Sequence, residues 1–510
     1  MNDSFFLKLR NLLYNFFHYI FIITFIAVLL IVFSFKGTIN DKVIMIFSTI
    51  ISLFFILGLY KKIVKSNIND KFFSYKFLIL TFFCFICIQI FLGMQLRVKP
   101  SWDFGSVYNE AVYLTKSDIW SISNESYFLM YPNNQFYLLI LTSIYKFLSF
   151  FGIAHYVVFG VLFNAIFVDV SLLIFYFCLK RIWNKKVAFF GLILSFICCA
   201  YTTYLPIFYT DTFPLPLTNI MLLLYIIVLK EKNLKKIFLY LVFLSISCMF
   251  AFQLKATAII VLVAIILHMI FLLNIKKSFI FTIIICFTFI CSLKIYTYSF
   301  EKSNILDMTQ YDRYNFPYTH WLMMGLKTPG GYNEEDYLYT KSFVTREEKL
   351  VANMEVIEKR ISNMEIDDFI NHIKHKINFT WYDGTYFSSV LLSRKPLTNN
   401  FIRDIVSVNG NYYPVFKSIC DGIHFSIIIF MVFSGIKGLL IMKRSNQMDF
   451  ISCVRLSVFG LFIFLLIWET KSKYLVNFLP LIYLVSIDGI QFLFSLITDK
   501  SIALKNSKNY

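Results

Sequence analysis

The chain has 510 residues and a formal net charge of +18, with 58% hydrophobic and only 15% charged residues. A soluble domain is nearer half apolar and a quarter charged, so this composition excludes a soluble globular protein. The basic residues stand at the ends of apolar runs and are not gathered with aromatic residues on one module, which also excludes nucleic acid as a partner.

The apolar residues gather into runs of the length that a helix needs to cross a bilayer. They predict an all-α, polytopic integral membrane protein with about twelve transmembrane helices, which has the lipid bilayer as its surroundings. The predicted spans are 12–34, 42–60, 76–95, 154–179, 187–203, 214–229, 237–252, 257–274, 278–297, 423–441, 451–468 and 474–493.

The connections between these spans alternate between two kinds. One kind is dense in Lys and Arg, and its members are Lys61 to Lys65, Lys180 to Lys186, Lys230 to Lys236, Lys276 and Lys277, and Lys443 and Arg444. Basic connections stay on the cytoplasmic side of a membrane. We therefore expect a multi-pass protein of the plasma membrane with both termini in the cytoplasm.

The topology depends on how the apolar segment 136–151 is interpreted. A thirteenth span there would move every later connection to the opposite side of the membrane. The segment is short and carries Lys146 near its middle. We interpret it as an interfacial or re-entrant helix, which keeps the basic connections on one side.

Two long outer segments follow from this topology, and they set the expected domains. Residues 1–60 form N-terminal additional helices, 61–297 a transmembrane core with an outer catalytic loop 96–151, and 423–510 the C-terminal helices. Residues 298–422 are polar and rich in Tyr, and predict a small extracytoplasmic domain between the ninth and tenth helices, with an amphipathic helix around Arg346 to Lys376.

The sequence Ser101-Trp102-Asp103-Phe104-Gly105 follows the third span by a few residues. Aromatic residues anchor at a membrane interface, so Asp103 is expected close to the headgroups. A carboxylate held there could remove a proton from an acceptor hydroxyl. A solvated loop carboxylate beside an aromatic belt is the alternative.

The segment SWDFGSVYNEA, followed by Tyr131-Pro132-Asn133-Asn134 and a short apolar helix, resembles the GT-C superfamily of membrane glycosyltransferases. The resemblance is closest to Gram-positive bacterial members related to protein O-mannosyltransferases and aminoarabinose transferases. It implies that Asp103 is the catalytic carboxylate, that juxtamembrane helices follow it, and that the donor is a polyprenyl-phosphate sugar.

Two further outer connections carry motifs similar to those of the superfamily. Tyr209-Thr210-Asp211 lies where these proteins often have a second acidic residue, and Gln253-Leu254-Lys255 resembles an "IKPT" element. Asp211 would position a metal or orient the substrate, or it would simply belong to a polar turn. Lys255 would bind the lipid phosphate as a point charge, or it would only extend its ammonium to the interface.

The connection between the last two spans, Trp468-Glu469-Thr470-Lys471-Ser472-Lys473-Tyr474, resembles an "E-x-x-x-R-Y" signature, with Lys473 where Arg is usual. Lys cannot make the planar bidentate phosphate contact of Arg, but it supplies a charge. Beside the catalytic Asp103 and Asp211, the resemblance implies a set of substrate and lipid-phosphate contacts, namely Lys255, Lys473, Glu469, Tyr474, Trp102, Asn133 and Asn134.

These features predict an inverting glycosyltransferase that moves a sugar from a polyprenyl-phosphate donor to a hydroxyl of a cell-surface glycan, glycolipid or protein acceptor. No metal site is assigned, since His372 and His375 lack a carboxylate pattern around them; a divalent cation stays open as a cofactor. A transporter or flippase, or a polymerase of lipid-linked glycans, is the alternative. Asp169, near the middle of its span, is the residue that most favours transport.

Overall fold

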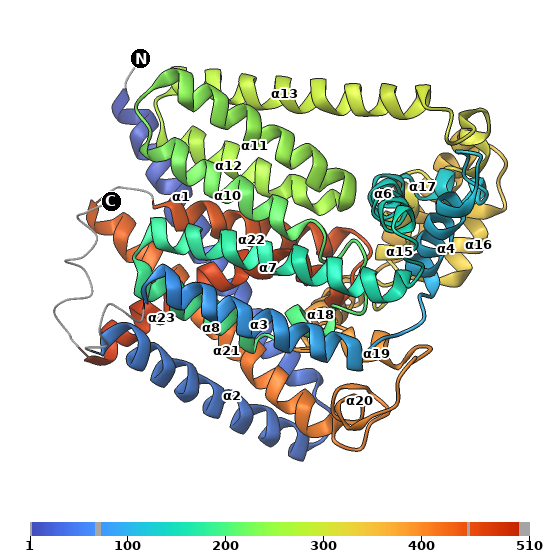
Figure 1. The fold of residues 1–510 in the computed structure, drawn as a ribbon. Helices are drawn as coiled ribbons and strands as arrows, with labels where there is room; N and C mark the ends of the chain where they lie inside the picture. The colour runs from blue at the N-terminus through green and yellow to red at the C-terminus, as the bar shows by residue number, and fades with distance from the viewer. Residues whose placement is uncertain (1–2, 67–72, 446–448, 499–510) are drawn as a thin grey trace.

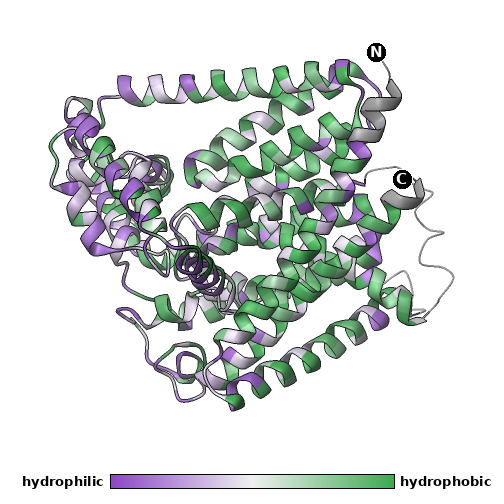
Figure 2. Ribbon diagram, turned by 180° about the vertical axis from the view of Figure 1, so that it is seen from behind, coloured by the Kyte–Doolittle hydropathy of each residue, from purple (hydrophilic) through white to green (hydrophobic). Residues whose placement is uncertain are grey.

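The computed structural model describes residues 3–66, 73–445 and 449–498. These residues form helices joined by short connections, and their one β-bridge pairs Val98 with Pro396. Long helices lie side by side in a bundle, and a layer of shorter helices covers one end of it (Figure 1). The bundle is largely apolar, whereas polar residues concentrate in the end layer (Figure 2).

Nine segments of the described residues are long and apolar enough to cross a membrane. They contain α1 (Asp3–Phe35), α2 (Ile39–Tyr60), α3 (Tyr75–Gln95), α7 (Tyr156–Ile182), α11 (Leu234–Leu254), α13 (Ile275–Lys302), α21 (Tyr413–Ser445), α22 (Phe450–Ile467) and α23 (Leu479–Thr498). The prediction of an all-α polytopic membrane protein is confirmed.

The other three predicted spans fall on shorter apolar helices. These are α8 (Lys185–Ile197), α10 (Leu215–Lys230) and α12 (Ile259–Leu272). The predicted span 187–203 is interrupted at Cys198, and the chain continues as the short α9 (Ala200–Thr203). Every predicted span therefore corresponds to a helix. Three of these helices, α8, α10 and α12, are shorter than the nine long ones.

Polar caps fix where the helices of the bundle begin at the end that carries the basic connections. The side chains of Asn184, Asn233 and Asn274 accept hydrogen bonds from the first backbone amides of α8, α11 and α13. Asp449 caps α22 in the same way. Because a helix leaves its first amides without partners, an Asn or Asp at each entry satisfies these groups and stops the helix from extending into the connection.

The end layer, which we call the cap, combines two distant parts of the chain. It contains α4 (Trp102–Lys116), α5 (Glu125–Met130) and α6 (Gln135–Phe150), and also α14 (Tyr311–Tyr314), α15 (Thr319–Gly325), α16 (Glu334–Lys341), α17 (Arg346–Ser362) and α18 (Ile366–Trp381). The cap lies opposite the end where α1 begins and α23 ends (Figure 1). Helices of the segment 298–422 pack on α5, α22 and α1, and its assignment as an extracytoplasmic domain stays a prediction.

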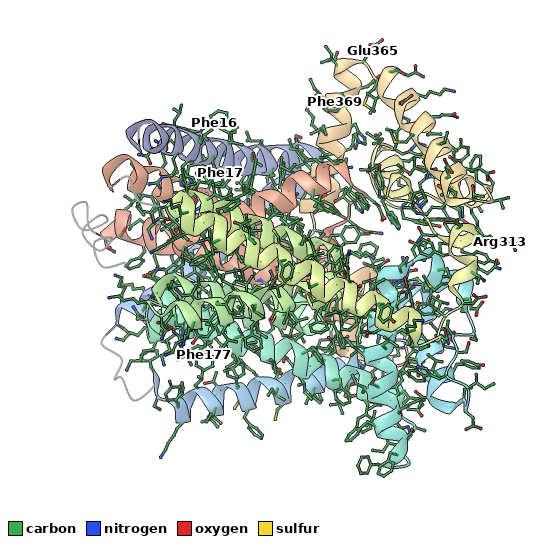
Figure 3. All side chains as sticks on the ribbon, turned by 90° about the horizontal axis from the view of Figure 1, so that it is seen from above. Phe16, Phe17, Phe177, Arg313, Glu365 and Phe369 are labelled. Atoms are coloured by element: carbon green, nitrogen blue, oxygen red, sulfur yellow. The ribbon has the colours of Figure 1, made fainter. Side chains whose placement is uncertain are left out.

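Helix α6 lies across the end of the bundle, seen end-on in Figure 1 and from the side in Figure 3. Its buried face includes Tyr137, Leu141 and Tyr145. Lys146 is exposed on the other face, with its Nζ 4.0 Å from the centre of the Trp120 ring. The orientation of α6 across the bundle agrees with the expectation of an interfacial helix. Because one face of α6 is exposed, Lys146 can lie on it without being buried.

The predicted single helix from Arg346 to Lys376 is wrong. The structure has two helices, α17 and α18, that turn at residues 363–365 and project together beside the bundle, with Glu365 at the tip (Figure 3). Asn363 and Met364 break the periodic pattern, and Asp367 and Asp368 favour a new helix start because acidic residues stabilise the first turn.

Candidate active site

Asp103 lies in the first turn of α4, at the junction of the bundle and the cap. The chain before it pairs in antiparallel fashion with residues 395–397. Lys99 N donates to Lys395 O at 2.9 Å, and Leu397 N donates to Arg97 O at 3.0 Å. This pairing fixes the direction in which the chain enters α4.

The backbone of Trp102 has a φ of +48°, which side chains other than glycine rarely adopt. Such a conformation costs about 1–3 kcal/mol and persists only where neighbouring contacts enforce it. The Arg394 guanidinium stacks on the Trp102 ring, with its Cζ 4.9 Å from the ring centre. The predicted contact residue Trp102 therefore lies beside Asp103, held by the strand-like pairing and by Arg394.

A directed chain of hydrogen bonds orients Asp103. The Tyr127 hydroxyl donates to Asp103 Oδ1 at 3.1 Å and accepts from Asn134 Nδ2 at 2.8 Å. The Tyr209 hydroxyl donates to Asn134 Oδ1 at 2.8 Å. Every donor points toward the carboxylate, an arrangement in which each bond polarises the next.

Asn134 is buried and uses both ends of its amide within this chain, so the structure gives it a supporting position behind Asp103. Asn133, its neighbour, is exposed. Of these two predicted contact residues, only Asn133 presents a free surface.

Asp211 and Lys255 form a second group at the same end of the bundle. Lys255 Nζ lies 2.5 Å from Asp211 Oδ1, with side chains 14% and 3% exposed. Lys255 ends α11, and Asp211 stands in the turn before α10. Burial lowers the pKa of Lys255, and the Asp211 carboxylate opposes this effect.

The third group is the connection between α22 and α23, residues 468–474, which we call the connector. The Tyr474 hydroxyl donates to Glu469 Oε1 at 3.1 Å, and Lys473 Nζ lies 5.3 Å from the centre of the Tyr474 ring. Within the described residues Lys473 forms no salt bridge. Its charge is therefore available to an anion.

The cap holds the connector in place. Thr470 N donates to Gly330 O at 2.7 Å, and Lys376 Nζ donates to Trp468 O at 2.8 Å. Thr380 and Thr470 share a hydrogen bond of 2.6 Å between their hydroxyls. The position of the connector thus depends on the loop after α15 and on α18, which no local sequence pattern reveals.

The three groups meet around Tyr474. Lys255 Nζ lies 5.0 Å from the centre of the Tyr474 ring, so both predicted lysines lie near the same ring. Burial raises the pKa of Glu469, Lys473 opposes this, and the negative charge of Asp103 adds to it. The second and third groups therefore place two lysines, Lys255 and Lys473, beside one ring, and each group also carries a carboxylate, Asp211 or Glu469.

Sequence reasoning gave no role to four residues of this site. Tyr127 carries no motif that marks it, and Arg394 lies in a loop predicted only as part of an outer domain. Tyr209 and Lys471 stand inside the motifs that carry Asp211 and Glu469, which was the available signal. Burial, together with the positive charges of Lys473 and Arg394, lowers the pKa of Lys471 to about 8.

The described residues contain no cluster of three or more His, Cys, Asp or Glu side chains that could hold a metal ion. Asp211, the predicted second acid, has its carboxylate bound to Lys255. His372 faces Thr328 and the carbonyl of Gly325. A carboxylate can remove a proton from a hydroxyl, and lysine ammonium groups can bind a phosphate.

A family model described as "conserved hypothetical integral membrane protein" matches residues 5–490. The chain belongs to this family. The match spans the bundle, the cap and the connector, so the whole site lies within the shared region. No curated protein matches the chain.

Two solved structures are similar to the chain, both of ArnT from Cupriavidus metallidurans, one bound to undecaprenyl phosphate and one in the apo state. Each has 10% sequence identity, with TM-scores of 0.35 and 0.36. They cover 81% and 83% of this chain and 78% and 79% of the ArnT chains. Both TM-scores lie below 0.5, so this similarity supports no conclusion about function. The grouping with Gram-positive glycosyltransferases stays a prediction.

Proposed function

We propose that the protein is a membrane glycosyltransferase that moves a sugar from a polyprenyl-phosphate donor to an acceptor hydroxyl on the outer face of the plasma membrane, with both termini in the cytoplasm. The observation that supports this most strongly is the position of Lys255 and Lys473 beside one ring, that of Tyr474. The hydroxyl of Tyr474 donates to Glu469, a carboxyl group whose pKa is raised first by burial and also by the negative charge of Asp103. A carboxylate beside two lysines suits a reaction in which a hydroxyl loses a proton and a phosphate leaves.

In the proposed reaction the donor phosphate lies near Lys255 and Lys473. The acceptor hydroxyl gives its proton to Asp103 and forms a bond to the anomeric carbon from the face opposite the phosphate. The bond from that carbon to the phosphate oxygen breaks, and its electron pair stays with the phosphate. The lysines stabilise this charge as it develops, and a single displacement inverts the anomeric configuration.

Asp211 contributes through Lys255 in this proposal. A buried lysine without a partner would be driven toward its neutral form, because burial disfavours the charge. The Asp211 carboxylate keeps Lys255 charged and fixes its direction. The same contact leaves Asp211 committed to the lysine, so the proposal needs no metal at this residue.

The test is transfer by the purified protein in vesicles supplied with a panel of polyprenyl-phosphate sugars. We expect Asp103→Asn to lower transfer by at least about 100-fold, within the range for losing a general base, while abundance stays normal. Asp118→Asn, at an exposed position after α4, is the matched control and should keep full transfer. Unchanged turnover in Asp103→Asn would remove this residue from the mechanism.

Transport is the second candidate, and Asp169 is the observation that favours it. This carboxylate lies in the middle of α7, is 5% exposed, and has no hydrogen-bond partner among the described residues. Two other charged residues within the helices of the bundle, Arg455 and Asp488, are paired, since Arg455 Nη2 lies 3.1 Å from Asp488 Oδ2. Accumulation of a lipid-linked sugar across vesicles that Asp169→Asn abolishes, without sugar transfer, would favour transport.

A further inference from the structure

A continuous row of five aromatic rings runs through the cap and ends at Asp103. The ring centres are 6.3 Å apart for Tyr332 and Tyr337, 5.8 Å for Tyr337 and Phe316, 6.0 Å for Phe316 and Tyr131, and 5.2 Å for Tyr131 and Tyr127. The hydroxyl of Tyr127 then donates to Asp103. We call these five residues the aromatic row.

The exposure of the aromatic row changes from one end to the other. Tyr332 is 59% exposed, whereas Tyr337, Tyr131 and Tyr127 are half-buried. Phe316, between Tyr337 and Tyr131, is buried and joins the two through ring contacts. The row therefore leads from the surface of the cap to the carboxylate that we propose as the general base.

The pKa values of two tyrosines of the row, Tyr131 and Tyr332, respond to the carboxylates of the site. Burial raises the pKa of Tyr131, and the charges of Asp103 and Glu469 add to this effect. The pKa of Tyr332 is also raised, first by burial, and the same two carboxylates contribute. The exposed tyrosine is thus within electrostatic range of the proposed catalytic carboxylate.

The loop that carries Tyr332 is fixed to the connector. A Cβ on Gly331 would lie 2.7 Å from the Phe379 ring and 3.4 Å from Thr470 O, so only glycine allows this approach. Gly330 has a φ of +91° and accepts the hydrogen bond from Thr470 N. A side chain held on such a loop is preorganised, which lowers the entropic cost of binding a partner.

We propose that the aromatic row binds the acceptor and that the acceptor is a carbohydrate chain. This inference rests on the proposed function and names its substrate class. A sugar ring presents C–H faces between hydroxyl groups, and a tyrosine offers an apolar ring face together with a polar hydroxyl, at a low cost in conformational entropy. Sugars held against the four tyrosines, which keep exposed surface, would bring a hydroxyl to Asp103.

Two other acceptor classes fit the surroundings of the row less well. A lipid acceptor needs an apolar surface that continues into the bundle, but the cap is the polar part of the molecule (Figure 2). An extended peptide commonly binds by adding a strand to a free sheet edge. No strand is present in residues 3–66, 73–445 and 449–498.

The experiment uses three fractions from the cell envelope of an organism that makes the protein: soluble glycan fragments, peptides and extracted lipids. The full chain in lipid nanodiscs is incubated with each fraction, and bound material is quantified by mass spectrometry. We expect the unaltered protein to retain glycan fragments. Tyr332→Ala should lower this retention about five-fold, since a stacked ring contributes on the order of 1 kcal/mol, and Tyr337→Phe, which keeps its ring, should lower it less.

Tyr339→Ala is the matched control, because Tyr339 lies on the same helix as Tyr337 but pairs with Phe343, 5.1 Å away. Tyr339→Ala should retain glycan fragments like the unaltered protein. Asp103→Asn should also retain them, because this variant is expected to lose sugar transfer and to keep the tyrosines that bind the acceptor. Retention of peptides or lipids alone, no retention of glycan, or equal retention in the Tyr332 and Tyr339 variants would overturn the proposal. Loss of transfer in Asp103→Asn tests the proposed function independently.

Discussion

At the scale of single residues, the site depends on side chains that direct one another. Tyr127 joins Asp103 to Asn134 through two hydrogen bonds, and Lys255 keeps its charge beside Asp211. Asp103 could be predicted, because its motif is local and lies just beyond a span. Tyr127 and Arg394 could not, because their approach to Asp103 depends on how α5 and residues 394–397 fold back onto α4.

Replacing Tyr127 by Phe removes the hydroxyl that orients Asp103 and leaves the ring in place. We expect kcat for sugar transfer to fall about ten-fold, since one hydrogen bond contributes roughly 0.5–1.5 kcal/mol, with little change in KM for the donor. Steady-state kinetics in vesicles measure both values. Tyr113→Phe, on the exposed side of α4, is the control; equal kinetics in the two variants would contradict the orienting role.

The Asp211–Lys255 pair predicts a non-additive effect on stability. Breaking a buried ion pair leaves an uncompensated charge, which costs about 3–5 kcal/mol, whereas removing both charges costs far less. Lys255→Met and Asp211→Asn should each lower the unfolding temperature in detergent. The double variant should be more stable than Lys255→Met alone. Additive losses would show that the two charges do not stabilise each other.

At the scale of elements, the docking of α18 on the connector determines where Glu469 and Lys473 lie. Lys376 is fully buried in α18, and its ammonium donates to the carbonyls of Gly325 and Trp468. The sequence predicted α18 as part of one amphipathic helix. Hydrophobic periodicity predicts that a segment is helical, but it does not predict the element on which the helix packs. Only the tertiary contact shows that α18 supports the connector.

Lys376 makes stability depend on pH. Burial lowers the pKa of Lys376 to about 7, and Glu469 opposes this. An unfolded lysine titrates near 10.4, so between about pH 7 and 10 the unfolded chain binds a proton that the folded chain lacks, and stability rises with pH. From pH 7 to 9 the unaltered protein should gain about 2 kcal/mol relative to Lys376→Met.

Unfolding in detergent at pH 7, 8 and 9 measures this difference. Lys374→Met, at an exposed position of the same helix, should show the same pH dependence as the unaltered protein. If Lys376→Met also gained stability in parallel with the unaltered protein, the buried ammonium would not be the cause.

At the scale of the whole molecule, the basic connections and the cap lie at opposite ends of the bundle (Figure 1). From the positive-inside rule we expect the cap, and with it Asp103, to lie outside the cell. We expect Asn133→Cys, at an exposed position of the cap, to react with a membrane-impermeant maleimide in intact cells.

Lys232→Cys, at an exposed position between α10 and α11, should react only after permeabilisation. Each variant is compared with the unaltered protein, because the chain has ten cysteines of its own. Labelling of both positions from the same side would contradict the topology on which the proposed reaction depends.

The sequence by itself determined the membrane class, the positions of the helices and the alternation of basic connections. These properties follow from local composition, since twenty apolar residues form a spanning helix whatever surrounds them and basic residues select a side. The tertiary structure alone decided that the segment 298–422 joins α4–α6 in one cap, that Lys376 supports the connector, and that an aromatic row reaches Asp103. Such contacts join residues hundreds of positions apart, and no local pattern specifies which polar surfaces will meet once the helices have packed.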